Sequence, residues 1–111
     1  MNMANWFTNR FSKRGKAVSL YKRGMAKAKN QDHQGAIQDY TAAIGMAATP
    51  ADVKGMAQYN RALAYAASGN DRKAMEDIDV VLTMSEALTS VKTEARRMLV
   101  RIERRSTDTR T

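Results

Sequence analysis

The sequence predicts an all-α domain of about five helices, built from antiparallel helix-turn-helix repeats. Apolar residues recur at helical spacing along most of the chain, and the alternating β-branched runs typical of strands are absent. The chain also matches itself at a fixed offset of 38 residues, which indicates a duplicated unit. Its length of 111 residues, with 27% charged and 43% hydrophobic residues, is typical of one small globular domain.

Identical residues 38 positions apart carry the repeat. Tyr21 corresponds to Tyr59, and Arg23 corresponds to Arg61. Further identical pairs include Ala26 with Ala64, Ala28 with Ala66, Ala36 with Ala74, Asp39 with Asp77 and Met46 with Met84. Because polar turn residues interrupt each unit once, each unit is predicted to fold as two helices.

The first unit begins with a predicted helix through Tyr21 and Met25, which recur at helical spacing. The polar residues 30–32 end this helix, and Asp32 is placed to cap the next one. That second helix carries its apolar face from Ala36 to Ile44.

The second unit opens at Thr49 and Pro50, where threonine suits a cap and proline suits the first position of a helix. Its first helix is predicted to stop at Gly69, and Asn70 is placed to cap the helix that follows. The acidic residues of the two second helices are predicted to lie on solvated faces; they are Asp39, Glu76, Asp77 and Asp79.

A fifth helix is predicted from about Ser85 to Arg104, because its apolar residues form one stripe. This stripe would cover the second unit on one side and leave the other side to water. Residues 106–111 are polar and are expected to form a flexible tail.

Small and aromatic residues occupy corresponding positions in both units. The first unit has Gly24, Ala36, Tyr40 and Ala43, and the second has Ala62, Tyr65, Ala74, Ile78 and Val81, with a turn glycine at Gly69. This pattern resembles the tetratricopeptide repeat (TPR). The resemblance implies a short right-handed solenoid over 16–105. Repeat one would span about 17–48, repeat two about 50–84, and a capping helix about 85–104.

The chain departs from the TPR pattern at several positions. Leu20 and Gln58 stand where the family has tryptophan, and Arg23 and Arg61 stand where it has leucine. The offset of 38 residues exceeds the usual 34 by one helical turn, which we place at 49–54.

Site templates for catalysis are not matched by the sequence. Cysteine is absent, no glycine-rich phosphate loop is present, and the single histidine, His33, is assigned to packing in a turn. No cluster of His, Asp and Glu has metal-ligand spacing. We therefore predict a protein that is not an enzyme, with no catalytic residues, no cofactor and no metal. No secretory signal or membrane-spanning stretch is evident, so a cytoplasmic protein is expected.

Basic residues concentrate at both ends of a chain whose net charge is +8. Residues 1–29 hold eight Lys/Arg and no acid, whereas residues 30–90 hold four bases and eight acids. This asymmetry favours an anionic partner: nucleic acid, a membrane surface or an acidic peptide. The acidic middle of the chain argues against a continuous basic face, so nucleic acid is the second choice.

The TPR resemblance implies that the first helix of each unit lines a concave groove for a peptide. The groove residues expected from it are Tyr21, Lys22, Met25, Lys29, Tyr59, Asn60, Leu63, Lys92 and Arg96. The basic edge favours a protein segment with acidic character, and the expected function is that of an adaptor. Some TPR proteins grip a terminal carboxylate with Lys, Asn and Arg. Here Tyr21 and Met25 replace part of that set, so the complete clamp is not predicted.

Residues 1–15 form a basic, aromatic N-terminal arm. Its candidate contact residues are Trp6, Phe7, Arg10, Phe11, Lys13 and Arg14. Three roles remain open for the arm: it lies on an anionic membrane, it binds nucleic acid, or its aromatic residues cap the first repeat or pair two chains as a homodimer. The last role is favoured because an uncapped repeat exposes apolar surface, and the membrane ranks lowest.

Overall fold

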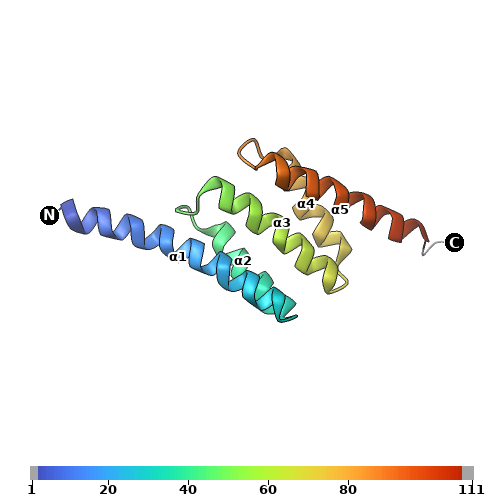
Figure 1. Cartoon of the computed structure of the whole chain (residues 1–111), viewed down its shortest axis with the longest axis horizontal. Helices are drawn as coiled ribbons and strands as arrows, with labels where there is room; N and C mark the ends of the chain where they lie inside the picture. The colour runs from blue at the N-terminus through green and yellow to red at the C-terminus, as the bar shows by residue number, and fades with distance from the viewer. Residues whose placement is uncertain (1–2, 109–111) are drawn as a thin grey trace.

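The structure, a computed structural model, describes residues 3–108, with side chains from Lys13 onward. Over this range the chain is all-α, as predicted, and it forms five helices (Figure 1). In chain order they are α1 (Met3–Lys29), α2 (His33–Gly45), α3 (Ala51–Ala67), α4 (Asp71–Thr83) and α5 (Thr89–Asp108). Each helix packs antiparallel against the next one along the chain.

Every second helix lies in the same layer. Helices α1, α3 and α5 run in the same direction in Figure 1, and α3 contacts both of the others. Helix α2 packs against α1 and α3, whereas α4 packs against α3 and α5, so α2 and α4 form a second layer. This arrangement follows from short hairpin turns, which return the chain alongside the helix that it has just left.

The two hairpin turns have the same backbone pattern. Gln31 and Gly69 occupy equivalent positions with φ angles of 66° and 84°. In each turn the next amide donates to the carbonyl five residues earlier, at 2.8 Å. The predicted caps are confirmed: the Asp32 and Asn70 side chains accept hydrogen bonds from amides three residues later, at 3.0 and 3.2 Å. The 38-residue repeat of the sequence is therefore also a repeat of backbone conformation in these two turns.

Replacing Gln31 by glycine is expected to stabilise the protein by about 1 kcal/mol. A side chain in the left-handed region costs roughly that amount, and glycine already occupies the equivalent position in the second turn. The midpoint of urea denaturation should rise. Gly69→Gln serves as the reciprocal variant and should lower the midpoint; a lower midpoint for Gln31→Gly would contradict the strain argument.

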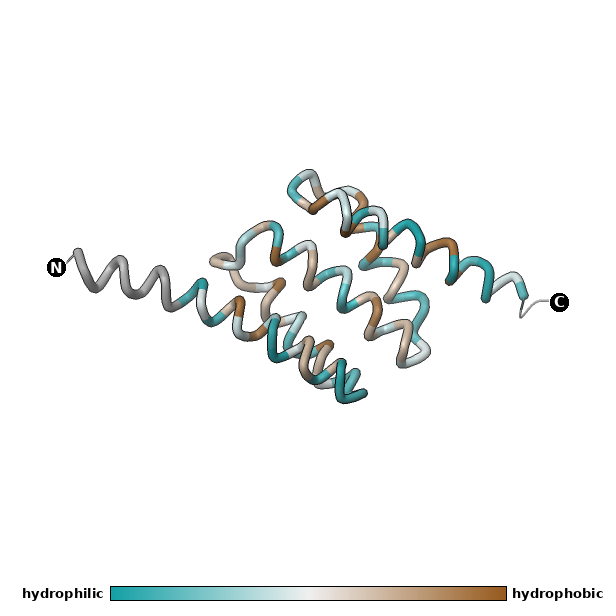
Figure 2. Tube along the Cα trace, viewed as in Figure 1, coloured by the Kyte–Doolittle hydropathy of each residue, from teal (hydrophilic) through white to brown (hydrophobic). Residues whose placement is uncertain are grey.

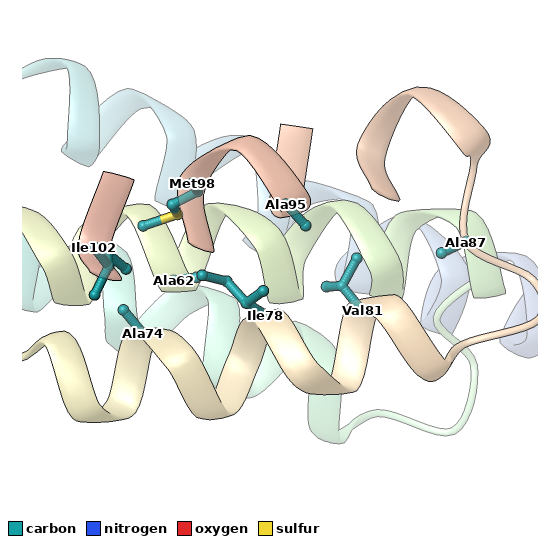
Figure 3. Packing of buried hydrophobic residues seen from close by; sticks show 8 residues of the cluster. All are labelled: Ala62, Ala74, Ile78, Val81, Ala87, Ala95, Met98 and Ile102. Carbon is teal, nitrogen blue, oxygen red and sulfur yellow. The ribbon is translucent and has the colours of Figure 1, made fainter. Parts of the chain in front are cut away.

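Buried apolar residues form two clusters of unequal size. The larger cluster lies between α3, α4 and α5 (Figure 3), and its members are Ala62, Ala74, Ile78, Val81, Ala87, Ala95, Met98 and Ile102. The smaller cluster contains Ala36, Tyr40 and Ala57, from α2 and α3, with Tyr21 and Ala28 of α1 packed against it. The apolar stripe of α5 packs into the larger cluster, on the side of the second unit where the fifth helix was predicted to lie.

Helices α1 and α2 are in close contact at Gly24. A Cβ atom built there would lie 2.7 Å from the Tyr40 ring, so only glycine fits without displacement of the ring. The corresponding residues of the second hairpin are Ala62 and Ile78, and both are fully buried in the larger cluster. The smaller isoleucine leaves room for the alanine, which explains why the two units differ at this position.

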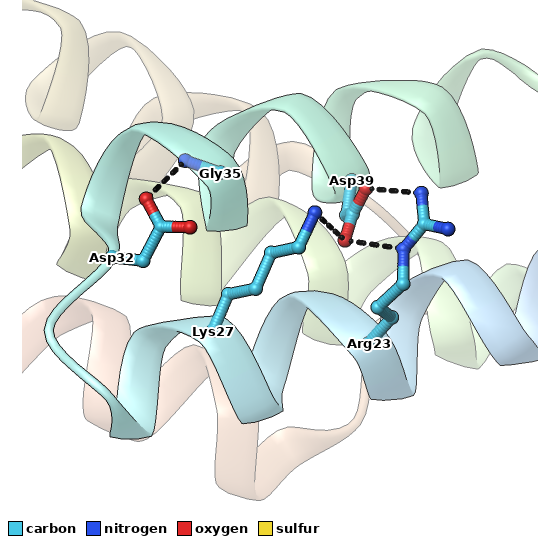
Figure 4. Close-up of polar contacts among 5 residues, drawn as sticks. All are labelled: Arg23, Lys27, Asp32, Gly35 and Asp39. Atoms are coloured by element: carbon cyan, nitrogen blue, oxygen red, sulfur yellow. Dashed lines mark hydrogen bonds and ion pairs between the residues drawn. The ribbon is translucent and has the colours of Figure 1, made fainter.

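An ion pair connects the two helices of the first hairpin. Arg23 donates two hydrogen bonds to the Asp39 carboxylate, at 2.8 and 2.9 Å, and Lys27 Nζ lies 3.1 Å from the same group (Figure 4). The hydrogen bond from Arg23 is the main cause of a lowered Asp39 pKa, and Lys27 adds to it. Asp39 is buried, so the prediction that it lies on a solvated face was wrong.

The second hairpin repeats this pair at the corresponding residues. Arg61 donates to both oxygens of Asp77, at 2.7 and 2.8 Å, and Gln58 Nε2 donates to Oδ1 at 2.7 Å. Asp77 is also buried, which corrects the solvated-face prediction for this residue too. Its neighbours Glu76 and Asp79 are not buried, which agrees with the prediction. The arginines that depart from the TPR pattern thus link α1 to α2 and α3 to α4.

Several element boundaries differ from the prediction. Helix α1 is continuous from Met3, so the expected arm and the first repeat helix share one element. Helix α5 begins at Thr89 rather than Ser85 and continues to Asp108, which places 106–108 in a helix. Thr49 does not cap α3; its Oγ1 donates to the Ala43 carbonyl at 2.5 Å, at the end of α2.

Candidate peptide-binding groove

An open groove of about 470 Å³ runs between α1 and α3, and α2 contributes to it. Its lining residues are Met25, Ala28, His33, Tyr40, Asn60, Leu63, Ala64 and Ala67. Most of this surface is apolar, with a few polar groups placed among the aliphatic ones. Clefts of this kind favour an apolar side chain that is fixed in place by a small number of hydrogen bonds.

Met25 and Leu63 are the large apolar side chains of the groove. They come from corresponding positions of α1 and α3, and each is 38% exposed. Removing exposed aliphatic surface of this size from water against a partner is favourable and stabilises the complex. Methionine adds unbranched, adaptable packing, which suits partner side chains of more than one shape.

A polar contact joins α3 to α1 beside the groove. Asn60 Nδ2 donates to the Tyr21 hydroxyl oxygen at 3.1 Å, so the Tyr21 proton stays available to another acceptor. Burial raises the Tyr21 pKa, and the hydrogen bond from Asn60 opposes that shift. Tyr21 therefore stays a hydroxyl donor at neutral pH and positions the Asn60 amide.

Tyr40 is an almost completely buried residue among those that line the groove. The residue is only 1% exposed, and its ring centre lies 6.1 Å from that of Tyr21. Burial, with smaller contributions from Tyr21 and Asp39, raises the Tyr40 pKa to about 12. The groove is therefore lined by this buried aromatic residue as well as by exposed side chains.

Only part of the predicted set converges here. Met25, Asn60 and Leu63 line the groove, and Tyr21 lies behind Asn60. Lys22 and Lys29 are exposed on α1 and do not line it. The predicted set did not include His33, which had been assigned to packing, or Tyr40, which is a core residue that also lines the groove.

The α5 residues predicted for this face lie outside the groove. Lys92 and Arg96 are not among its lining residues. Tyr59 instead has Glu94 and Arg101 as its charged neighbours on α5. Burial raises the Tyr59 pKa, Glu94 raises it further, and Arg101 lowers it. The buried apolar stripe of α5 determines how this helix is rotated. The rotation in turn determines which of its basic side chains lie near α3.

The arm residues can be placed only in part. The side chains of Trp6, Phe7, Arg10 and Phe11 lie outside the described residues. Lys13 and Arg14 are exposed and line a shallow depression of about 400 Å³ together with the α2–α3 loop at 47–50.

Neither metal-binding clusters nor membrane spans are found in the described part of the chain. No three His, Asp or Glu side chains there gather closely enough to hold a metal ion. Among these helices, none has the length and apolarity needed to cross a bilayer. No family model, no curated protein and no solved structure matches the chain.

Proposed function

We propose that this protein is a small, non-enzymatic adaptor of TPR type, which binds a partner's peptide segment in the groove between α1 and α3. The observation that carries the proposal is the pair of exposed side chains, Met25 and Leu63, which line the same open groove. An exposed apolar pair in an open groove suits a peptide that offers an aliphatic side chain.

Recognition would combine these elements. An aliphatic side chain of the partner packs between Met25 and Leu63. Lys22 and Lys29 lie about one turn on either side of Met25 and are exposed, so they favour acidic residues next to that side chain. The TPR assignment itself is supported by the equivalent turns and ion pairs of the two hairpins.

A displayed peptide library would test this function, with selected peptides measured by fluorescence anisotropy. Enriched peptides should combine an aliphatic residue with nearby acids. The double variant Met25→Ser/Leu63→Ser should lose at least tenfold in affinity, because about 1.5–3 kcal/mol accompanies burial of each large aliphatic side chain.

The matched control is Val80→Ser on α4, which removes a similarly exposed apolar side chain, 44% accessible, outside the groove. Its affinity should stay within twofold of the unmodified protein. An equal loss in this control, or a library without enriched peptides, would contradict the groove assignment.

A further inference from the structure

The two helix layers carry opposite charge. Over residues 13–108, α1, α3 and α5 together hold fifteen Lys/Arg and four Asp/Glu, a net charge of +11. Helices α2 and α4 together hold two Lys/Arg and five Asp/Glu, a net charge of −3. The acidic middle of the sequence therefore contains one basic helix, α3, and two acidic helices, α2 and α4. Antiparallel hairpins place both acidic helices in the second layer, where each packs against helices of the basic layer.

Most of the positive charge on this basic layer is exposed and outside ion pairs. Arg23, Lys27 and Arg61 pair with buried aspartates, and Arg97 pairs with Glu94 at 2.6 Å. Eight exposed bases of the layer form no ion pair within 13–108; they are Lys13, Arg14, Lys16, Lys22, Lys29, Arg96, Arg101 and Arg104. In Figure 2, hydrophilic residues recur along both α1 and α5.

The distribution of these bases favours an extended polyanion. From Lys13 to Lys29 they span about 24 Å of α1, and a second group follows on α5, on the other side of α3. A short acidic peptide seated in the groove would not reach both groups. A nucleic acid backbone offers closely and regularly spaced phosphates over any such distance.

A bilayer surface fits this layer less well. An interfacial helix must insert its apolar face among the lipids. The described part of α1 already packs Ala17 and Gly24 inside the protein, and α5 packs Ala95, Met98 and Ile102 there. Within 13–108, neither helix keeps a continuous apolar face for insertion.

We propose that the layer formed by α1, α3 and α5 binds the phosphate backbone of nucleic acid through the exposed bases of α1 and α5. This binding relies on charge rather than on base recognition, and it does not depend on the groove. The expected affinity therefore falls steeply with salt and varies little with base sequence.

Anisotropy with a fluorescein-labelled single-stranded oligonucleotide of about 20 nucleotides would test this proposal across salt concentrations. The variants Lys13→Gln/Lys16→Gln and Arg101→Gln/Arg104→Gln should each weaken binding by at least fivefold. Each should also reduce the slope of log affinity against log salt by about 0.7 for every phosphate that is no longer neutralised. Circular dichroism should show unchanged helix content in both variants.

Two controls separate this proposal from the others. Arg72→Gln/Lys73→Gln removes the same charge from α4 and should leave binding within twofold, as should Leu63→Ser in the groove. The proposal is overturned if the oligonucleotide does not bind at about 50 mM salt, if the salt response is flat, or if the α4 variant loses as much as the other two. Binding to anionic vesicles but not to the oligonucleotide would equally overturn it.

Discussion

Replacing Gly24 by alanine is expected to destabilise the folded protein by about 1–3 kcal/mol, although alanine is the better helix former. The added methyl group would meet the Tyr40 ring at 2.7 Å, where α1 packs against α2. Urea denaturation would measure the loss. Gly15→Ala is the matched control in the same helix, because a methyl group there meets nothing within 4 Å. It should stabilise the protein by about 0.5–1 kcal/mol.

A double-mutant cycle would identify the cause of that loss. Tyr40→Ile reproduces the smaller residue that faces Ala62 in the second hairpin. The combined variant Gly24→Ala/Tyr40→Ile should be more stable than the sum of the single effects by about 1 kcal/mol or more. Strict additivity, or a Gly24→Ala variant as stable as Gly15→Ala, would show that the clash is relieved without cost.

Replacing Asp77 by alanine is expected to cost about 3 kcal/mol, because it removes the acceptor of a largely buried ion pair. The Arg61 side chain is only 18% exposed and would lose its partner, as would the Gln58 amide. Asp39→Ala is the informative comparison, because the Arg23 side chain is 61% exposed and would recover water. That variant should lose about 1 kcal/mol. Equal losses in the two variants would contradict the role given to burial.

The Asp39 pair also predicts a pH dependence. The pKa of Asp39 is lowered in the folded state, chiefly by the Arg23 hydrogen bond, so its contribution is complete above the ordinary carboxyl pKa. It is lost as the pH falls through the lowered value, that is, below about pH 4. Asp39→Asn should reduce the loss of folding stability in that pH range. An unchanged loss of stability at acid pH would contradict this assignment.

The sequence predicted the helices better than the interactions between them. Helical spacing and the 38-residue offset predicted five helices, and Asp32, Asn70 and Gly69 marked the turns correctly. Asp39 and Asp77 were assigned to solvent because acidic residues are seldom buried without a partner. The partners were visible, however, since Arg23 and Arg61 recur at the same offset as the two aspartates. A charged pair that recurs in every repeat indicates an ion pair between its helices.

The candidate site could be predicted only where one helix face determined it. Met25, Asn60 and Leu63 follow from the periodicity of α1 and α3, and the structure brings them together. Tyr40 lines the groove from α2. Helical periodicity predicts a buried residue at this position but not that it borders a groove. On α5, the predicted groove residues Lys92 and Arg96 depended on the rotation of a helix whose start lies four residues later than expected.

The unequal cores link binding to the order of the first hairpin. Among the side chains of 13–108, the larger cluster has eight buried apolar residues, seven of them in α3, α4 and α5, whereas the smaller cluster has three. The first hairpin therefore opens locally at a lower free energy than the rest of the domain. Because the groove spans α1 and α3, a bound peptide would connect the less stable first hairpin to the more stable part formed by α3, α4 and α5. Part of its binding energy would go into closing the fold, and the protein would be most rigid when it is occupied.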